Sequence, residues 1–144
     1  MTNPLLQPWN TPFEIAPFQD ISDSDFAPAF ASALAEDMAE TLAVAHGSDA
    51  PSFANTVEAL ARTGKALEKV LSVFYTVSGA DSNATRENLM RDFSPKLAAH
   101  SSAIYSNKEL FARIDTLWQN RENLELTAGM SAKSTALVSD VSFA

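Results

Sequence analysis

The stretch FANTVEALARTGKALEKVLSVFYTVS, residues 53–78, decides the fold class of this chain. Its apolar and small residues recur at steps of three and four: Val57, Leu60, Gly64, Leu67, Leu71, Phe74 and Ser78. This spacing places them in one stripe along a helix, as in packed helices. Asn55 followed by Glu58 is typical of a helix start. The pattern predicts one central helix, roughly 35 Å long at ~1.5 Å per residue, with the rest of the chain packed around it.

Length and composition fit one folded domain. The chain has 144 residues, of which 46% are hydrophobic, so a core is expected. Glycine is scarce, alanine is abundant and no run alternates with a period of two, which favours helices throughout. The absence of cysteine excludes disulfides and thiolate metal sites, and fits a reducing compartment. We therefore expect a cytoplasmic protein.

The net charge of −8 is concentrated in the first part of the chain. Residues 1–61 contain nine acidic residues and no lysine or arginine. This acidity argues against a nucleic-acid partner, whose phosphates would be repelled. It leaves two interpretations, a solvated acidic face or an acidic surface that steers cationic ligands. No apolar run approaches the ~20 residues of a membrane span, and the first residues lack the basic region of a secretory signal.

Residues 1–21 contain four prolines, which forbid a helix and favour extended backbone. The sequence predicts an irregular strap lying over other elements. The strap is also too apolar for a free tail, because it carries Leu5, Leu6, Trp9, Phe13, Ile15 and Phe18. We expect Leu5, Leu6, Trp9, Phe13 and Phe18 to form an exposed patch that causes weak self-association.

Three further helices follow from start and stop signals. The first begins at Ser22–Asp25, tolerates Pro28 in its opening turn and ends at His46–Gly47. The next is capped by Asn83, with a kink or restart expected at Ser94–Pro95. The last begins with the capping box Ser106-x-x-Glu109. The predicted fold is therefore all-α, an antiparallel bundle of about four helices with an irregular Pro-rich N-terminal strap.

One domain followed by a tail of different character is predicted. Residues 1–128 form the helical domain. Residues 129–144, GMSAKSTALVSDVSFA, have neither periodicity nor caps and form an aberrant or disordered tail.

The residues do not assemble a catalytic motif. The chain has only two histidines, no cysteine, no His-Glu-x-x-His, no Gly-x-Ser-x-Gly and no glycine-rich phosphate loop. We interpret His46, in the last turn of a helix, as a partner of the helix dipole rather than as a metal ligand. We interpret His100 as a hydrogen-bonded core residue rather than as a ligand or a base. We interpret the acidic residues 36, 37 and 40 as part of a solvated helix face rather than as a functional acid cluster. We interpret Trp118 as a residue that anchors packing rather than as a surface for ligand binding.

Several short motifs resemble the N-terminal segment of the thimet oligopeptidase family of zinc metallopeptidases, and most closely its bacterial peptidyl-dipeptidase and oligopeptidase A branch. The resemblance covers roughly residues 1–128. The motifs are Asn3-Pro4-Leu5-Leu6, Pro12-Phe13, Phe26-x-Pro28-Ala29-Phe30, Phe53-x-Asn55-Thr56-Val57-Glu58-Ala59-Leu60, Ser94-Pro95-Lys96-Leu97 and Ile104-Tyr105-Ser106-Asn107-x-x-Leu110-Phe111-x-Arg113-Ile114.

The resemblance implies a helical, two-lobed hydrolase that encloses a channel and cleaves short peptides. In that family two histidines of a His-Glu-x-x-His helix and a downstream glutamate hold zinc. None of these residues falls on a position of this sequence, so no catalytic, cofactor-binding or metal-ligating residue is assigned to it. The resemblance implies that this part supplies outer helices and channel wall, that the missing catalytic region is its partner, and that the chain is an inactive fragment.

A second function class stays open beside this one. A stand-alone helical module that binds peptides or a protein partner would have the same helical patterns and the same lack of catalytic motifs. The apolar strap favours the peptidase interpretation, because an isolated module would leave the strap poorly buried.

Overall fold

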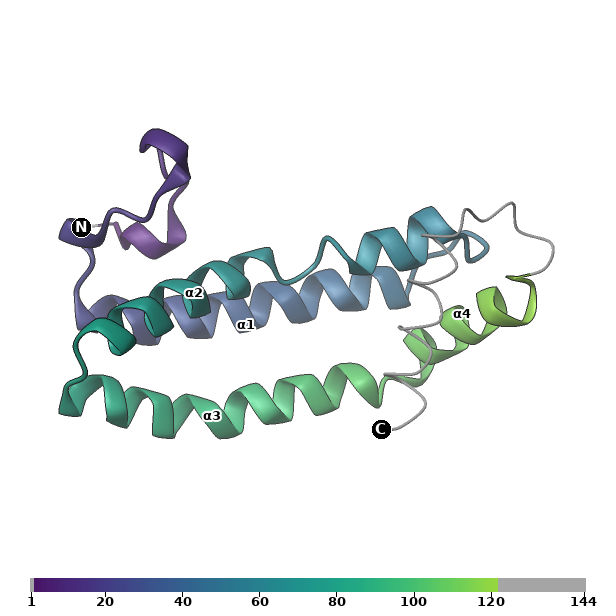
Figure 1. The fold of residues 1–144 in the computed structure, drawn as a ribbon. Coiled ribbons are helices and arrows are strands. Elements are labelled where there is room, and N and C mark those ends of the chain that lie inside the picture. Colours follow the sequence, from purple (N-terminus) through teal and green to yellow (C-terminus); the bar gives the residue numbers. More distant parts are fainter. Residues whose placement is uncertain (1, 122–144) are drawn as a thin grey trace. The chain divides into compact units, whose positions relative to one another are not determined.

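The computed structural model describes residues 2–121, and all regular elements in that range are helical (Figure 1). The four longer helices are α1 (Asp23–Ala45), α2 (Lys65–Ala80), α3 (Ala84–Tyr105) and α4 (Lys108–Gln119). The predicted all-α class with about four helices is confirmed. None of these helices is long and apolar enough to cross a membrane. The prediction for residues 129–144 lies outside the described residues.

The strap is built from three short 3-10 helices, η1 (Pro4–Leu6), η2 (Pro12–Glu14) and η3 (Phe18–Asp20). The strap is Pro-rich and irregular, as predicted. The prediction that its five large apolar side chains form one exposed patch is wrong in part. Leu5 is buried in the core and Trp9 is half-buried, so these two side chains are not part of an exposed patch. The Asn3 side chain caps η1 and also donates to the carbonyl of Asp25, which fastens the strap to α1.

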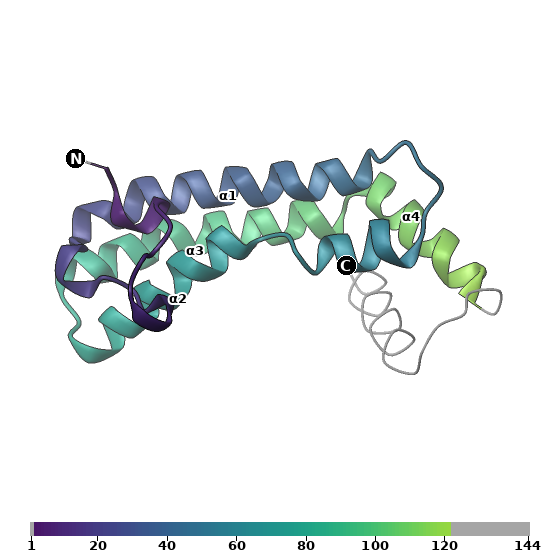
Figure 2. The same ribbon diagram turned by 90° about the horizontal axis from the view of Figure 1, so that it is seen from above.

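The chain forms two compact units. The first combines Met1–Asp37 with Gly64–Ala98, and the second combines Met38–Thr63 with Ala99–Ala144. In the first unit α2 runs back along α1, and α3 turns back again beside them (Figures 1 and 2). The antiparallel arrangement therefore holds for the three helices of this unit.

Four phenylalanines from three helices form the core of the first unit. Phe26 meets the edge of Phe74 with ring centroids 5.1 Å apart, and Phe30 stacks on Phe93 at 4.6 Å. The buried face of α2 consists of Leu67, Val70, Val73 and Phe74. Leu71, which the sequence places in the same stripe, is only half-buried. The buried face of α2 is therefore rotated slightly about the helix axis from the stripe that the sequence predicts.

The single central helix predicted over residues 53–78 is wrong, because the chain breaks at Gly64. A short π-helical element, η4 (Phe53–Glu58), precedes the break and α2 follows it. Gly64 has φ +73°, a left-handed conformation that glycine adopts without the usual steric penalty. A Cβ atom there would lie 3.1 Å from the Asp37 carboxylate. Both the conformation and the close approach require glycine.

Two helix starts differ from the prediction by a few residues. Ser52 caps η4, with its Oγ 3.1 Å from the Asn55 amide, and the Asn55 side chain accepts in return from the Ser52 amide at 2.8 Å. Asn55 thus occupies the N3 position, the last of the capping box, and is not its N-cap. At α4 the cap is Asn107, whose Oδ1 accepts from two amides, and not Ser106. Asn83 accepts from the Arg86 amide at 2.9 Å, as a cap of α3 should.

Two prolines lie inside helices. Pro28 falls in the second turn of α1 rather than in its opening turn. Of the kink or restart predicted at Ser94–Pro95, the restart is wrong, because α3 continues through Pro95. Each proline lacks the N–H that would bond four residues back. Beside Pro95, Ser94 Oγ donates to the Met90 carbonyl at 2.7 Å.

Candidate functional site

The two histidines do not form a metal site. His46 Nε2 lies 2.6 Å from Glu109 Oε2, linking the end of α1 to the first turn of α4, and both side chains are more than half exposed. His100 is half-buried on α3. Within residues 2–121 no group of three or more potential ligands could hold a metal ion. The part of the chain that the structure describes therefore offers no ligand set for the family's zinc.

The predicted acidic face has one exception. Glu36 is exposed and Glu40 is half-buried, but Asp37 is 8% exposed and lies beside Gly64. A solvated role for Asp37 is therefore wrong. The helical spacing could not reveal this, because the segment that covers Asp37 comes from residues far along the chain.

A buried arginine organises the second unit. Arg113 on α4 is 8% exposed and donates from Nη1 to the carbonyls of Gly47, at 2.7 Å, and Asp49, at 3.1 Å. Its Nη2 donates to Asn55 Oδ1 at 3.1 Å. These contacts tie α4 to the segment that leaves α1 and to η4. We call these four residues the Arg113 cluster.

Asn55 is the second centre of this cluster. Its side-chain amide donates to the Ala50 carbonyl at 2.9 Å, while its oxygen also accepts from Thr56 Oγ1 at 2.9 Å. Thr56 is fully buried beside it. The Phe-x-Asn-Thr and Leu-Phe-x-Arg-Ile motifs, which carry much of the resemblance, thus meet in one hydrogen-bonded cluster. Their shared role in this unit is structural.

The sequence did carry a signal for this arginine. Leu110, Ile114 and Leu117 form the buried face of α4, and Arg113 lies within the same helical stripe. A charged residue in an apolar stripe predicts a buried, hydrogen-bonded group. Trp118, predicted as a packing anchor, is half-buried and carries the Arg121 guanidinium 4.5 Å from the centre of its ring.

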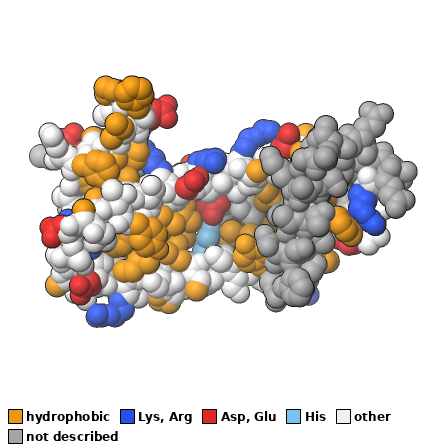
Figure 3. Space-filling view, viewed as in Figure 1, with side chains coloured by type: hydrophobic (Ala, Val, Ile, Leu, Met, Phe, Trp, Pro, Cys, Tyr) orange, Lys and Arg blue, Asp and Glu red, His pale blue; other side chains and the backbone are white. Residues whose placement is uncertain are grey.

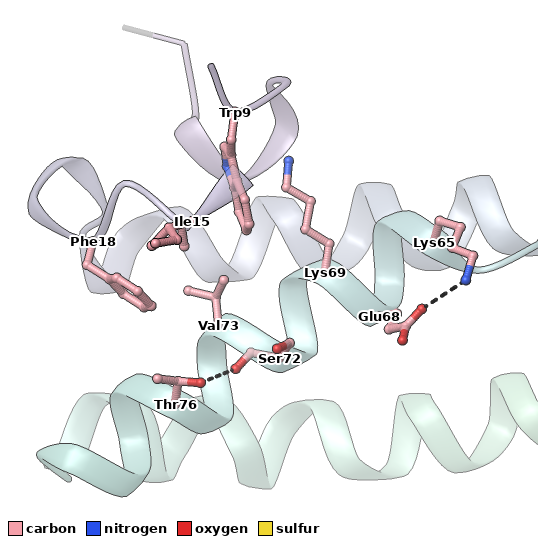
Figure 4. A pocket seen from close by; sticks show the side chains of 10 residues that line it. Trp9, Ile15, Phe18, Lys65, Glu68, Lys69, Ser72, Val73 and Thr76 are labelled. Carbon is pink, nitrogen blue, oxygen red and sulfur yellow. Dashed lines mark hydrogen bonds and ion pairs between the residues drawn. The ribbon is translucent and has the colours of Figure 1, made fainter. Parts of the chain in front are cut away.

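A groove in the first unit lies between the strap and α2 (Figure 4). Its volume is about 410 Å³. Trp9, Ile15 and Phe18 face it from the strap, and α2 supplies the opposite wall. The α2 residues of this wall are Lys65, Glu68, Lys69, Ser72, Val73 and Thr76. The mixture of aromatic, aliphatic and lysine side chains suits an apolar group with an acidic flank.

Lys69 holds the strap against α2. Its Nζ donates to the Gln7 carbonyl at 2.6 Å and lies 4.1 Å from the centre of the Trp9 ring. The Trp9 indole N–H in turn donates to the Pro4 carbonyl at 3.0 Å. Burial against the strap lowers the pKa of Lys69 below its usual value. Lys69 is therefore committed to positioning the strap.

Part of the strap remains at the surface. Hydrophobic side chains gather there in the space-filling view (Figure 3). Phe13 is 95% exposed, and Leu6, Ile15 and Phe18 are exposed to 40–55%. Soluble proteins rarely leave a contiguous apolar surface of this kind without a partner. The geometry of the first unit thus points to an interaction surface.

A second groove of about 420 Å³ continues past Phe18 toward the start of α1. One wall holds an ion pair between Asp23 Oδ1 and Arg86 Nε, 2.7 Å apart. The Asn83 side-chain amide donates to the same carboxylate at 2.8 Å. This hydrogen bond and the nearby arginine lower the pKa of Asp23 despite its partial burial.

Comparison with known proteins gives two curated relatives. The chain is 39% identical over 125 residues to a dipeptidyl carboxypeptidase of Salmonella typhimurium, an alignment that covers 87% of this chain and 18% of the relative. It is 37% identical over 136 residues to a dipeptidyl carboxypeptidase of Escherichia coli, covering 94% of this chain and 19% of the relative. No family model matches the chain. These similarities confirm the resemblance found in the sequence: the chain belongs to the dipeptidyl carboxypeptidase branch of the thimet oligopeptidase family, of whose curated relatives it spans less than a fifth.

Proposed function

We propose that this chain forms the non-catalytic N-terminal part of a zinc-dependent peptidase that cleaves short peptides. Its helices would supply the outer layer and part of the channel wall of the whole enzyme, in the cytoplasm. The observation that carries this proposal is the similarity to the two dipeptidyl carboxypeptidases over about nine-tenths of this chain. The Arg113 cluster supports it, because two of the motifs that carry the resemblance are used there for structure and not for chemistry.

Zinc and the bond-breaking step would belong to other parts of such an enzyme. The 144 residues contain two histidines and no His-Glu-x-x-His, so this chain cannot supply the ligand set of the family. We therefore expect the purified chain to contain no stoichiometric zinc and to leave short peptides intact. Elemental analysis together with a peptide-cleavage assay checks this. Chelator-sensitive cleavage by the chain would overturn the proposal.

A stand-alone binding module is the second candidate, and the groove between the strap and α2 favours it. Trp9 and Phe18 would receive an apolar peptide, and Lys65, an exposed lysine of the same groove, would face its carboxylate. Titration of the chain with short peptides, followed by calorimetry, separates the two functions. Saturable binding that Ser72→Asp, at an exposed position of the groove, abolishes would favour the module. The same conclusion needs a graft of the chain into a peptidase to restore no activity.

A further inference from the structure

The tip of the strap, Pro12–Glu14, presents Phe13 almost wholly to solvent. No other large hydrophobic side chain in the described part is as exposed as Phe13, at 95%. The backbone is unusual as well, because Phe13 has φ 60° and Glu14 has φ 55°. Residues other than glycine rarely adopt this left-handed conformation, and two in succession persist only where the surrounding structure enforces them.

The turn is held at its base. The Glu14 amide donates to the Thr11 carbonyl at 3.1 Å, and Thr11 Oγ1 donates to the Ile15 carbonyl. Both bonds close the turn beneath Phe13. The tip is therefore a defined turn with the aromatic ring at its apex.

The strap is also fastened on both sides of the tip. Before it, Trp9 lies against Lys69 and donates to Pro4. After it, Ala16 packs against the core of the first unit, and its carbonyl accepts from the Phe18 amide at 2.8 Å. A ring that is held out by an anchored, conformationally unfavourable turn is suited to insertion into a partner.

The surroundings of the tip define the chemistry of that partner. Ile15 and Phe18 extend the apolar surface, with 55% and 45% exposure. Glu14 and Asp20 add negative charge. Lys69 of α2 lines the same hollow as Glu14, but its ammonium group is held by the Gln7 carbonyl and the Trp9 ring. A complementary surface therefore has an apolar recess for Phe13 and a rim of basic side chains.

We propose that the tip docks Phe13 into such a recess on the region that the dipeptidyl carboxypeptidases possess outside the matched segment. This inference rests on the proposed function. The relatives are long enough to supply the surface, because this chain covers only 18 and 19% of their length. The Pro12–Phe13 pair is one of the motifs that carry the resemblance. Docking of the strap would then hold the N-terminal part on the catalytic part.

The test uses two grafts into the Escherichia coli relative. One graft replaces its matched segment with this chain, and the other introduces only residues 2–21. In each, Phe13→Ala is compared with Gln19→Ala, an exposed polar position of the same strap. We expect Phe13→Ala to shorten the half-life of thermal inactivation at least about tenfold, as for loss of a buried aromatic ring. Glu14→Lys should also shorten it, and Gln19→Ala should not.

The isolated chain provides the matched control. There Phe13 has almost no contacts to lose, so Phe13→Ala should leave the melting temperature within about 1 °C. If Phe13→Ala leaves the half-life of thermal inactivation of active grafts unchanged, the proposal is overturned. It is also overturned if the isolated chain forms a dimer that Phe13→Ala dissociates, because a second copy of the chain would then occupy the tip. Loss of activity in both unmutated grafts also overturns it. If the graft of the whole chain is inactive while the graft of residues 2–21 is active and is destabilised by Phe13→Ala, the proposed function is refuted and the docking of Phe13 is not.

Discussion

Arg113 donates a hydrogen bond from Nη2 to Oδ1 of Asn55 at 3.1 Å, across 58 residues of sequence. The same guanidinium holds two carbonyls of the segment between α1 and η4. Gly47 belongs to this arrangement, since a Cβ atom there would lie 3.2 Å from Arg113 Nη2. The second unit therefore depends on one buried, charge-assisted network as much as on its small apolar core of Ala45, Leu110 and Ile114.

Replacing Arg113 with methionine should strongly destabilise the second unit. The substitution keeps an apolar stem but removes the donor that serves the carbonyls of Gly47 and Asp49. The Asn55 oxygen keeps its bonds from the Ser52 amide and the Thr56 hydroxyl. Groups left unsatisfied in this way cost ~1–3 kcal/mol each, so a loss of at least about 2 kcal/mol is expected for the two carbonyls. Urea unfolding checks it.

The matched control for this change is Arg62→Met. The Arg62 side chain is 73% exposed, and its pair with Glu58 at 3.4 Å should contribute under ~1 kcal/mol. Arg113→Lys should fail to restore stability, because an ammonium cannot reproduce the planar fork of donors. Equal effects of Arg113→Met and Arg62→Met would show that the network contributes little.

Replacing Gly64 with alanine should lower the stability of the chain, and replacing Gly79 with alanine should raise it. Gly64→Ala places a Cβ at φ +73° and 3.1 Å from Asp37, and should cost at least ~1 kcal/mol. Gly79 lies within α2, and beyond its own stretch of helix backbone a Cβ added there would meet nothing within 4 Å. Gly79→Ala should therefore stabilise the chain by about 0.5–1 kcal/mol. Thermal unfolding of the two variants checks this, and stabilisation by Gly64→Ala would contradict it.

Neighbouring aromatic residues on α2 provide a test of the core. Phe74 is 1% exposed and contacts Phe26 and Phe30, whereas Tyr75 is 54% exposed. Phe74→Ala should cost ~3–5 kcal/mol by leaving a cavity. Tyr75→Ala should cost less than about 1 kcal/mol. Chemical denaturation separates the two, and similar costs would mean that the buried face of α2 is assigned wrongly.

Acid stability should depend on Asp23. Its pKa in the folded chain is lowered below 3.8, first by the hydrogen bond from Asn83 and also by Arg86. A depressed carboxyl pKa contributes stability above the unfolded pKa, and this contribution is lost as the pH falls through the folded pKa. Asp23→Asn should therefore be less stable near neutral pH and lose less stability between about pH 5 and about pH 2. Parallel pH profiles would contradict the assignment.

Patterns local in sequence predicted much of the fold. The start and end of α1 and the Asn83 cap of α3 follow from capping residues that act within a few positions. The buried face of α2 follows only in part from the apolar spacing: Leu67 and Phe74 were placed correctly, Leu71 was misplaced and Val73 was left out of the stripe. The break at Gly64 was missed because a glycine fits an apolar stripe, and only the approach of Asp37 shows why it must be glycine.

Contacts that are distant in sequence explain the other differences. The burial of Arg113 needs acceptors from residues 47–55, and the anchoring of Trp9 needs Lys69, 60 positions later. Similarly, Leu5 appeared exposed because no property of residues 1–21 reveals that the strap enters the aromatic core. The exposure of Phe13 was predicted, but the left-handed turn that holds it outward was not.

The placement of the two tryptophans gives the chain a built-in pair of optical reporters. Trp9 belongs to the first compact unit and Trp118 to the second, and the sequence contains no other tryptophan. Each indole lies beside a cation, Lys69 or Arg121, so its fluorescence should change when that contact opens. The variants Trp118→Phe and Trp9→Phe would thus each report on one unit alone. Release of the strap should appear in the emission of Trp9 before the helices of that unit lose their circular dichroism.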